Sequence, residues 1–452
     1  HALNHHRTRH QKFATVAARD HEQAIAGLTA LAAGDSAPGV VQPAAALPGP
    51  GTVFVFSGQG SHWVGMGRRL LADEPVFAAA VAELEPVFVR QVGFSLREVI
   101  EQGVEISGDA QVQPVIMGLQ LALAALWSSY GVVPDAVIGH SMGEVSAAVV
   151  AGALTPEQGL KVIGVRSALM SRQAGQGAVA LLELDAVAAS ELLAGYPGVE
   201  VAGDLSPRQT VVAGSPADVD AVIAAVAAAE RFARRVNMEV ASHTAFMDPI
   251  LDELRAELAG ITPQMPQIPF ISTVVDPAGP TPRLDADYWV ANVRQPALVS
   301  QAVTVATADH DTFIEISPHP LLTHSIIETA ETAAAEPVTV ASTLRRGDDE
   351  TLSFHVQLTE LGGQHSGTGV AKAGGFAELP TTPWQHSRHW LHAPVRAGQA
   401  PDVHPLLGVH VEQLTGGHLW QNDLLAEAMP WLAEQPAHGQ AVASVAALIE
   451  MA

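Results

Sequence analysis

The chain has no cysteine among its 452 residues, and this absence removes several kinds of chemistry. A thiolate nucleophile, a disulfide framework and a cysteine-ligated zinc site are excluded, and such a composition is typical of a cytoplasmic protein. Basic residues are also scarce, because 23 Lys and Arg stand against 47 Asp and Glu, for a formal net charge of −24. Nucleic acids and anionic membranes require a basic face. We therefore expect neither as a partner.

The sequence also lacks an apolar run long enough to span a membrane, and its polar start is unlike a signal peptide. That start is rich in histidine, but His1, His5, His6 and His10 share no helical face and have no carboxylate among them, so we expect no metal site. The chain is 48% hydrophobic and 15% charged. This balance predicts a folded protein with an ample core, divided into about three structured pieces.

Strands and helices alternate from residue 51 to residue 363, which predicts an α/β fold with a mainly parallel, hydrolase-like sheet. Within it, residues 178–239 predict the order βαββαβ, which is typical of a ferredoxin-like subdomain. The large lobe would then comprise residues 51–177 and 240–363. Linkers are expected on both sides, at 1–50, which includes an Ala-rich helix at 21–33, and at 364–400, and a further unit begins at 401–452. Within the large lobe, Pro114 is expected to open a long helix that Gly131 closes.

The most informative motif is Gly139-His140-Ser141-Met142-Gly143. A short apolar strand at 136–138 precedes it and a helix rich in Ala and Val follows at 144–153. Ser141 is therefore expected on a strand-to-helix elbow above a helix N-terminus. The free N–H groups of such a terminus can stabilise an oxyanion. This context indicates a serine nucleophile for acyl transfer.

A base and two oxyanion donors can be proposed for Ser141. His243, in Val240-Ala241-Ser242-His243, is the candidate base. The main-chain N–H of Met142 and that of Gln59, in a Gly-rich turn after the strand 52–56, are the candidate oxyanion donors. Intervening acidic residues such as Asp185, Asp204 and Asp218 lie in the inserted subdomain, so a Ser-His dyad oriented by a main-chain carbonyl is favoured over a triad.

Arg166 lies in the apolar helical segment 160–170. A guanidinium aimed into the cleft would bind a substrate carboxylate through two hydrogen bonds. A surface arginine is the other interpretation. From these residues alone, three functions stay open: transfer of a carboxylated acyl group, a serine hydrolase or thioesterase that does not need Arg166, and a structural module without activity.

The motifs, taken together and in order, resemble acyltransferase domains of modular type I polyketide synthases. The resemblance covers about residues 51–363 and rests on the following segments: Phe56-Ser57-Gly58-Gln59-Gly60-Ser61, Gly139 to Glu144, Arg166-Ser167, Ala241-Ser242-His243, Tyr288-Trp289-Val290 with Asn292, and Ser317-Pro318-His319-Pro320. It implies that residues 1–50 link a ketosynthase to the acyltransferase. Residues 364–400 would be the linker that follows the acyltransferase.

The resemblance implies a role for each site residue. An extender-unit CoA thioester would acylate Ser141, with His243 as base and the main-chain carbonyl of Asn292 orienting it. Arg166 would pair with the free carboxylate of the extender, and Gln113 would occupy a pocket position. The acyl group would pass to the phosphopantetheine thiol of an acyl carrier protein, with other domains of the same megasynthase as partners. No bound cofactor is implied.

Extender choice is predicted from the residues before His243. The family motif is usually Tyr-Ala-Ser-His for methylmalonyl units and His-Ala-Phe-His for malonyl units. In this chain Val240 replaces the tyrosine, but Ser242 leaves room for an α-methyl branch where phenylalanine would crowd it. We therefore predict methylmalonyl, with a malonyl-specific enzyme as the alternative. One methyl group is worth only about 1 to 3 kcal/mol of discrimination.

The C-terminal unit resembles the start of a dehydratase hot-dog domain through His404-Pro405-Leu406-Leu407-Gly408 and Trp431-Leu432-Ala433. In that family a catalytic histidine is followed by glycine and then proline. Here those places hold Gln435, Gly439 and Ser444. Glutamine cannot serve as an acid or base, so the unit is predicted to be non-catalytic.

A basic cluster of Arg231, Arg234 and Arg235 permits two interpretations. It could contact an acidic carrier protein, or it could be the solvated edge of a strand.

Overall fold

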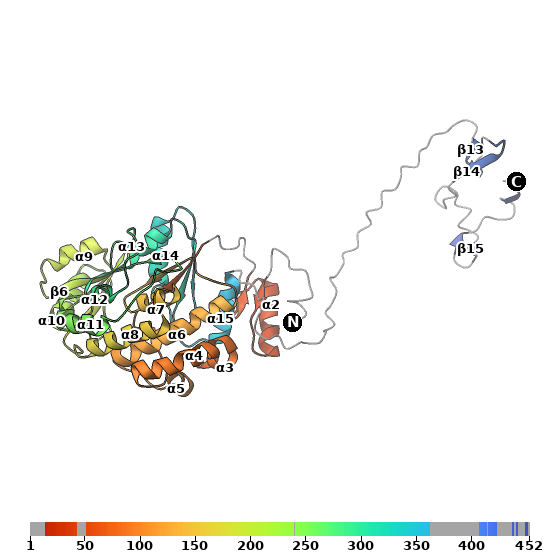
Figure 1. Cartoon of the computed structure of the whole chain (residues 1–452). Helices are drawn as coiled ribbons and strands as arrows, with labels where there is room; N and C mark the ends of the chain where they lie inside the picture. Colours follow the sequence, from red (N-terminus) through yellow and green to blue (C-terminus); the bar gives the residue numbers. More distant parts are fainter. Residues whose placement is uncertain are drawn as a thin grey trace. The chain divides into compact units, whose positions relative to one another are not determined.

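The computed structural model describes residues 14–42, 51–238, 240–361, 406–413, 415–422, 436–437, 440–441 and 448–450. The chain divides into two units, residues 1–377 and 378–452, and each is described by itself (Figure 1).

A five-stranded parallel sheet organises the large lobe, with the strand order β12-β11-β3-β4-β9. Its strands are β3 (Thr52–Phe56), β4 (Ala136–Gly139), β9 (Phe270–Ile271), β11 (Thr312–Ile316) and β12 (Thr339–Ser342). Because β3 and β4 are parallel neighbours, their carboxyl ends meet at one edge of the sheet. Gln59 and Ser141 follow these two ends, as the sequence predicts.

Helices cover both faces of this sheet because its strands are apolar on both sides. In β3, Phe54 and Phe56 pack into the larger core, whereas Val53 and Val55 pack into a second core on the opposite face. The larger core includes α4 (Pro75–Val92), α6 (Asp109–Ser129) and α8 (Pro156–Ser171), and the second includes α13 (Val299–Ala306) and α14 (Thr323–Ala333) (Figure 1). The remaining helices of the lobe are α3 (Arg68–Asp73), α5 (Leu96–Gln102), α7 (Gly143–Val150), η1 (Ala245–Met247), α11 (Asp248–Leu258), α12 (Ala286–Arg294) and α15 (Glu350–Glu360).

Helix α6 corrects one expectation from the sequence. We expected Pro114 to open this helix, but α6 begins at Asp109 and holds Pro114 inside it. Neighbouring helices compensate for the hydrogen bond that proline cannot donate, since almost every residue of α6 from Val112 onward is buried. Among the described residues, α6 is also the one helix long and apolar enough to cross a membrane, but 83% of its apolar window is buried in the protein. Such burial is that of a core helix.

The inserted subdomain has the predicted ferredoxin-like order. It comprises β5 (Ala178–Leu182), α9 (Ala186–Leu193), β6 (Val199–Ser206), β7 (Gln209–Gly214), α10 (Pro216–Ala228) and β8 (Ala233–Val236). Its four strands pair antiparallel in the order β6-β7-β5-β8. The fold class expected from the sequence is therefore confirmed. A short strand of the large lobe, β10 (Ala297–Leu298), extends this sheet by pairing parallel with β6.

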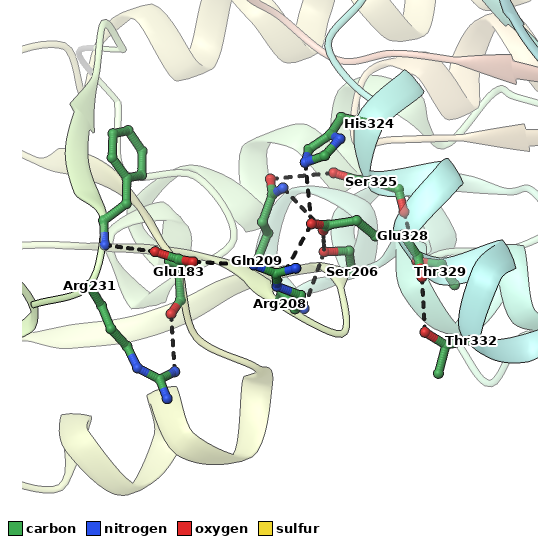
Figure 2. Close-up of polar contacts among 11 residues, drawn as sticks. Glu183, Ser206, Arg208, Gln209, Arg231, His324, Ser325, Glu328, Thr329 and Thr332 are labelled. Atoms are coloured by element: carbon green, nitrogen blue, oxygen red, sulfur yellow. Dashed lines mark hydrogen bonds and ion pairs between the residues drawn. The ribbon is translucent and has the colours of Figure 1, made fainter.

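A polar cluster joins the subdomain to the large lobe at a second place (Figure 2). Glu328 of α14 accepts hydrogen bonds from Ser206 Oγ at 2.6 Å and Gln209 Nε2 at 3.2 Å, both from the β6–β7 hairpin. His324 Nε2, one turn earlier in α14, lies 3.2 Å from the same carboxylate. The inserted sheet is thus tied to the lobe by strand pairing and by side chains.

The residues before the sheet form a small docked element. It consists of α2 (His21–Ala33) and the antiparallel pair β1 (Thr15–Val16) and β2 (Val40–Val41). Arg19 forms ion pairs with Asp73 and Asp349 of the large lobe. This contact fixes the element expected to be a linker against the lobe that follows it.

The second unit is described only in part. It contains an antiparallel hairpin of β13 (Val409–Glu412) and β14 (His418–Gln421), and a short pair of β15 (Pro436–Ala437) and β16 (Gln440–Ala441). The positions that decide dehydratase chemistry, Gln435, Gly439 and Ser444, lie outside the described residues. The prediction that this unit is non-catalytic stays a prediction.

Candidate active site

Ser141 lies on a sharp elbow between β4 and α7. Its φ of 55° is in the left-handed region, which a non-glycine residue adopts only where the surrounding structure imposes it. The two glycines of the motif permit that elbow: a Cβ at Gly139 would collide with the backbone of Glu144, and a Cβ at Gly143 with the backbone of Phe56. The Gly-x-Ser-x-Gly pattern is therefore required by close approach of main chains.

His243 faces the nucleophile directly. Its Nε2 lies 2.8 Å from Ser141 Oγ, which is hydrogen-bond distance for proton transfer. Its side chain is only 6% exposed, and its φ of 64° shows that the base, like the nucleophile, is held in a strained backbone conformation. The structure thus brings together the pair predicted from the sequence.

The carbonyl that orients His243 differs from the expected one. We expected the main-chain oxygen of Asn292, but His243 Nδ1 lies 2.8 Å from the main-chain oxygen of Gln295. Helix α12 ends at Arg294, and Gln295 adopts an extended conformation that turns its carbonyl out of the helical direction. Asn292 still lies within the helix, so its carbonyl follows the helix axis. The dyad oriented by a backbone carbonyl is present, but a different residue supplies that carbonyl.

Asn292 supports the elbow through its side chain instead. Its Nδ2 donates to the main-chain oxygen of Ser141 at 3.0 Å and to Glu144 Oε2 at 2.9 Å. Glu144 is fully buried and also accepts from Tyr288 Oη and from the Thr273 main-chain N–H. The sequence alone indicated no role for Glu144 or Tyr288. The available signal was a carboxylate at the start of an otherwise apolar helix.

Arg166 approaches the nucleophile from α8. Its side chain is 1% exposed, and one terminal nitrogen donates to Ser141 Oγ at 2.8 Å while the other donates to Gln113 Oε1. Within the described part of the chain no carboxylate forms an ion pair with this guanidinium, and its buried Nε has no hydrogen-bond partner. A buried charge without a direct ion-pair partner is costly, so the site is suited to an anionic ligand.

The candidate oxyanion donors lie where the sequence predicts. Met142 precedes the first residue of α7, and Gln59 lies in the turn after β3, on the neighbouring strand. Among the backbone hydrogen bonds of the described residues, neither main-chain N–H is used inside the protein. Both groups are therefore available to an oxygen atom of a ligand at Ser141.

Comparison with known proteins identifies the family. Residues 53–369 match the family described as "Acyl transferase domain". The chain belongs to this family. Residues 404–452 match the family described as "Polyketide synthase dehydratase domain".

Curated relatives of the acyltransferase are phenolphthiocerol/phthiocerol polyketide synthase subunits of Mycobacterium tuberculosis. The chain is 56% identical over 456 residues to one of them, covering 100% of this chain and 24% of that protein. It is 50% identical over 444 residues to another from the same organism, covering 95% of this chain and 24% of that protein. The chain thus spans about a quarter of the length of these relatives.

Solved structures agree with this assignment. The acyltransferase domain of the polyketide synthase PpsC of M. tuberculosis superposes with a TM-score of 0.65 at 57% identity, covering 71% of this chain and 97% of that chain. The acyltransferase domain from module 8 of the salinomycin polyketide synthase gives a TM-score of 0.74 at 35% identity, covering 80% and 87%. The resemblance to polyketide synthase acyltransferase domains predicted from the sequence is confirmed.

Two regions line the acyltransferase cavity, which has a volume of about 50 Å³. The large lobe contributes mainly polar side chains, whereas Val179, Ala202, Val211 and Met238 of the inserted subdomain contribute an apolar wall. Gln113 and Ser242 line the cavity, as expected for pocket residues. Val240, which the sequence placed with them as a candidate pocket and specificity residue, does not line it; its side chain is 1% exposed and packs in the core of the large lobe. Its apolar side chain is removed from water in that core.

The buried site changes the proton affinity of its two nitrogen bases. Burial, with the positive charge of Arg166 as a smaller contribution, lowers the pKa of His243 from 6.5 to about 3. The imidazole is therefore neutral near pH 7 and able to accept a proton. Burial also lowers the pKa of Arg166 to about 10, against the opposing effects of Asp109 and Glu144. The guanidinium remains charged at neutral pH.

Two other features bear on ligands. No group of three or more His, Cys, Asp or Glu side chains suited to a metal ion occurs in the described ranges. A larger cavity of about 680 Å³ lies between the N-terminal element and α15, but it lacks a nucleophile paired with a base.

In the basic cluster, Arg231 donates to the main-chain oxygen of Glu183 (Figure 2) and Arg235 pairs with Asp220. Contact with a carrier protein through this cluster stays one of the two interpretations.

Proposed function

We propose that this acyltransferase loads an extender unit from CoA onto Ser141 and transfers it to the phosphopantetheine thiol of an acyl carrier protein. The observation that carries the proposal is the buried guanidinium of Arg166, 2.8 Å from the nucleophile and without an ion-pair partner among the described residues. A carboxylate on the acyl group would supply the missing counter-charge. Acyl groups without one would leave a buried charge unpaired.

In the first half-reaction His243 Nε2 takes the proton of Ser141 Oγ as the oxygen attacks the thioester carbonyl. The main-chain N–H groups of Gln59 and Met142 stabilise the resulting oxyanion. The carbon–sulfur bond then breaks, and the imidazolium returns its proton to the departing CoA thiolate. The carbonyl of Gln295, held at 2.8 Å, keeps the imidazole tautomer that presents an unprotonated Nε2 to the serine.

The second half-reaction reverses the roles. The phosphopantetheine thiol gives its proton to His243 Nε2 and attacks the acyl-serine, and the Ser141 oxygen leaves with that proton. Arg166 binds the carboxylate throughout, having exchanged its hydrogen bond to Ser141 Oγ for the substrate. No bound cofactor takes part in these steps; CoA is the leaving group, and phosphopantetheine belongs to the partner.

We further propose methylmalonyl as the preferred extender. Ser242 lines the cavity with a small side chain, and the wall from the inserted subdomain contains Ala202, which is also small. A branch at the α-carbon therefore meets little bulk on either side. Partner domains of the same megasynthase and a cytoplasmic location are part of the same proposal, supported by the polyketide synthase relatives.

Intact-mass spectrometry of the chain mixed with malonyl-CoA or methylmalonyl-CoA tests the proposal. We expect the mass of one acyl group on the wild type and none on Ser141→Ala. A label that persists on Ser141→Ala would refute the nucleophile. Rapid hydrolysis of uncarboxylated acyl esters by the wild type would favour a thioesterase instead.

The extender prediction is tested by the ratio of kcat/KM for the two CoA esters. We expect the wild type to favour methylmalonyl-CoA, and Ser242→Phe to move the ratio toward malonyl-CoA by about 10-fold or more, as expected for one methyl group in a tight pocket. Ser190→Phe, a change on the exposed part of α9 away from the cavity, is the matched control. A wild-type preference for malonyl-CoA would contradict the prediction.

A further inference from the structure

A chain of side-chain hydrogen bonds reaches the carboxylate-binding arginine from the start of α6. Gln59 Nε2 donates to Asp109 Oδ1 at 2.9 Å, and Gln113 Nε2 donates to Gln59 Oε1 at 3.1 Å. Arg166 then donates to Gln113 Oε1 and, through its other terminal nitrogen, to Ser141 Oγ. Asp109 is thus connected to the nucleophile through two amides and one guanidinium.

The charged groups at the two ends of this series of hydrogen bonds, Asp109 and Arg166, determine the direction of every bond between them. A carboxylate only accepts hydrogen bonds and a guanidinium only donates them. Each amide between them must therefore turn its NH₂ group toward Asp109 and its oxygen toward Arg166. If either amide were reversed, an NH₂ group would face the guanidinium or a carbonyl oxygen would face the carboxylate, and a buried polar pair would lose its hydrogen bond.

Burial makes this constraint strong. Asp109 is 6% exposed, Gln113 is 2% exposed and Arg166 is 1% exposed, so water competes little for their hydrogen bonds. Gln59 has a second role, because its main-chain N–H is one of the proposed oxyanion donors.

We propose that Asp109 is a positioning residue that sets the orientation of Gln59 and Gln113 and so holds Arg166 ready for the substrate carboxylate. This inference rests on the proposed function of Arg166. Asp109 does not touch the substrate; it acts through the two amides. A neutral residue at position 109 would no longer determine which way the amides of Gln59 and Gln113 are turned.

A purely structural role for Asp109 makes a different prediction. As the first residue of α6, an acid interacts favourably with the helix N-terminus. Loss of that effect would lower stability and would reduce turnover of every acyl-CoA alike. The positioning role predicts a loss confined to acyl groups that carry a carboxylate.

The test compares the full chain with Asp109→Asn, using methylmalonyl-CoA and propionyl-CoA as acyl donors. For Asp109→Asn we expect kcat/KM to fall about 10-fold with methylmalonyl-CoA and to change less than about 2-fold with propionyl-CoA, since a misdirected hydrogen bond to a charged group costs about that factor. In the Arg166→Ala background the same change should have no further effect. Glu157→Gln is the matched control, because Glu157 is an exposed first-turn acid on α8, the helix of Arg166.

Gln59→Leu provides a second route if Asp109→Asn fails to fold. This substitution interrupts the series of side-chain hydrogen bonds but keeps the main-chain N–H of residue 59 and the start of α6. We expect the same loss of kcat/KM, confined to methylmalonyl-CoA. Equal losses with both donors, or additive losses with Arg166→Ala, would overturn the positioning role. Failure of the wild type to accept any carboxylated acyl group would instead refute the proposed function.

Discussion

The large lobe and the inserted subdomain contribute different things to one cavity. All the polar side chains that reach Ser141 come from the large lobe: His243, Arg166, and behind them Gln113 and Gln59. The described residues that the subdomain contributes are Val179, Ala202, Val211 and Met238, which are all apolar. Reacting groups that share one rigid body keep their geometry, while an apolar wall from another sheet can vary in shape without disturbing them. The comparison predicts that chemistry and size selection can be altered separately.

The largest effect is expected from Arg166→Ala, which removes the charged group of the large lobe. The value of kcat/KM for methylmalonyl-CoA should fall about 100-fold or more, because a desolvated charge pair is lost. The value of kcat/KM for propionyl-CoA, whose acyl group has no carboxylate, should be equal to or higher than that of the wild type. Acylation rates from quenched mass spectrometry measure both.

Arg172→Ala is a suitable control for this change, since Arg172 lies just after α8 and forms an exposed ion pair with Glu253. Equal effects of Arg166→Ala and Arg172→Ala on kcat/KM for methylmalonyl-CoA would contradict the assignment of substrate binding to the polar side chains of the large lobe.

A smaller effect is expected from the apolar wall. Ala202→Leu adds bulk to the subdomain side of the cavity and should lower the ratio of methylmalonyl to malonyl use by about 10-fold, within the 1 to 3 kcal/mol expected for tight hydrophobic pockets. The absolute rate with malonyl-CoA should change little. Competition between the two CoA esters measures the ratio.

Ala217→Leu, at the exposed start of α10, tests whether added bulk in the subdomain matters by itself. A large loss with malonyl-CoA in Ala202→Leu would show that the wall also positions the reacting groups.

The smallest effect is expected from pH, because both titrating groups of the site have pKa values several units from neutrality. His243, with a pKa of about 3, stays an unprotonated base above that value, and Arg166, with a pKa of about 10, stays charged below it. Acylation should therefore be nearly constant from about pH 5 to about pH 9. An acid limb near pH 6.5, the ordinary value of histidine, would contradict this prediction.

The same lowered pKa affects stability. Below pH 6.5 the unfolded chain binds a proton at His243 that the folded protein does not take up until about pH 3, so the free energy of unfolding should fall as the pH decreases through this range. His243→Gln should reduce the slope of denaturation midpoint against pH over this interval. His324→Gln, with its exposed side chain, serves as the control.

Local patterns predicted much of the fold. The helix at 21–33 and the strand at 52–56 have the predicted bounds, and the inserted βαββαβ order is confirmed with ends shifted by a few residues. These elements are set by apolar periodicity and by capping residues close in sequence. The elbow at Ser141 was also predictable, because its glycines permit close contacts with the main chain that no other residue allows.

Errors arose where distant segments decide the outcome. Pro114 lies inside α6 because helices packed around it stabilise the turns that precede it. The carbonyl that orients His243 comes from Gln295 because α12 ends one residue earlier, and Val240 enters the core because the chain bends there. In each case the sequence shows the residue but not the direction in which the folded chain turns it.

The sequence by itself determined the chemistry available to this protein: a serine on a glycine-bounded elbow, a histidine, and an arginine in an apolar helix, without cysteine. It also determined the alternation of elements that forms the parallel sheet. Only the tertiary structure decided that Arg166 is buried beside Ser141 without an ion-pair partner among the described residues, and that Asp109 is connected to it through two amides. Burial and hydrogen-bond direction depend on contacts between segments that are distant in sequence, and local sequence patterns do not specify those contacts.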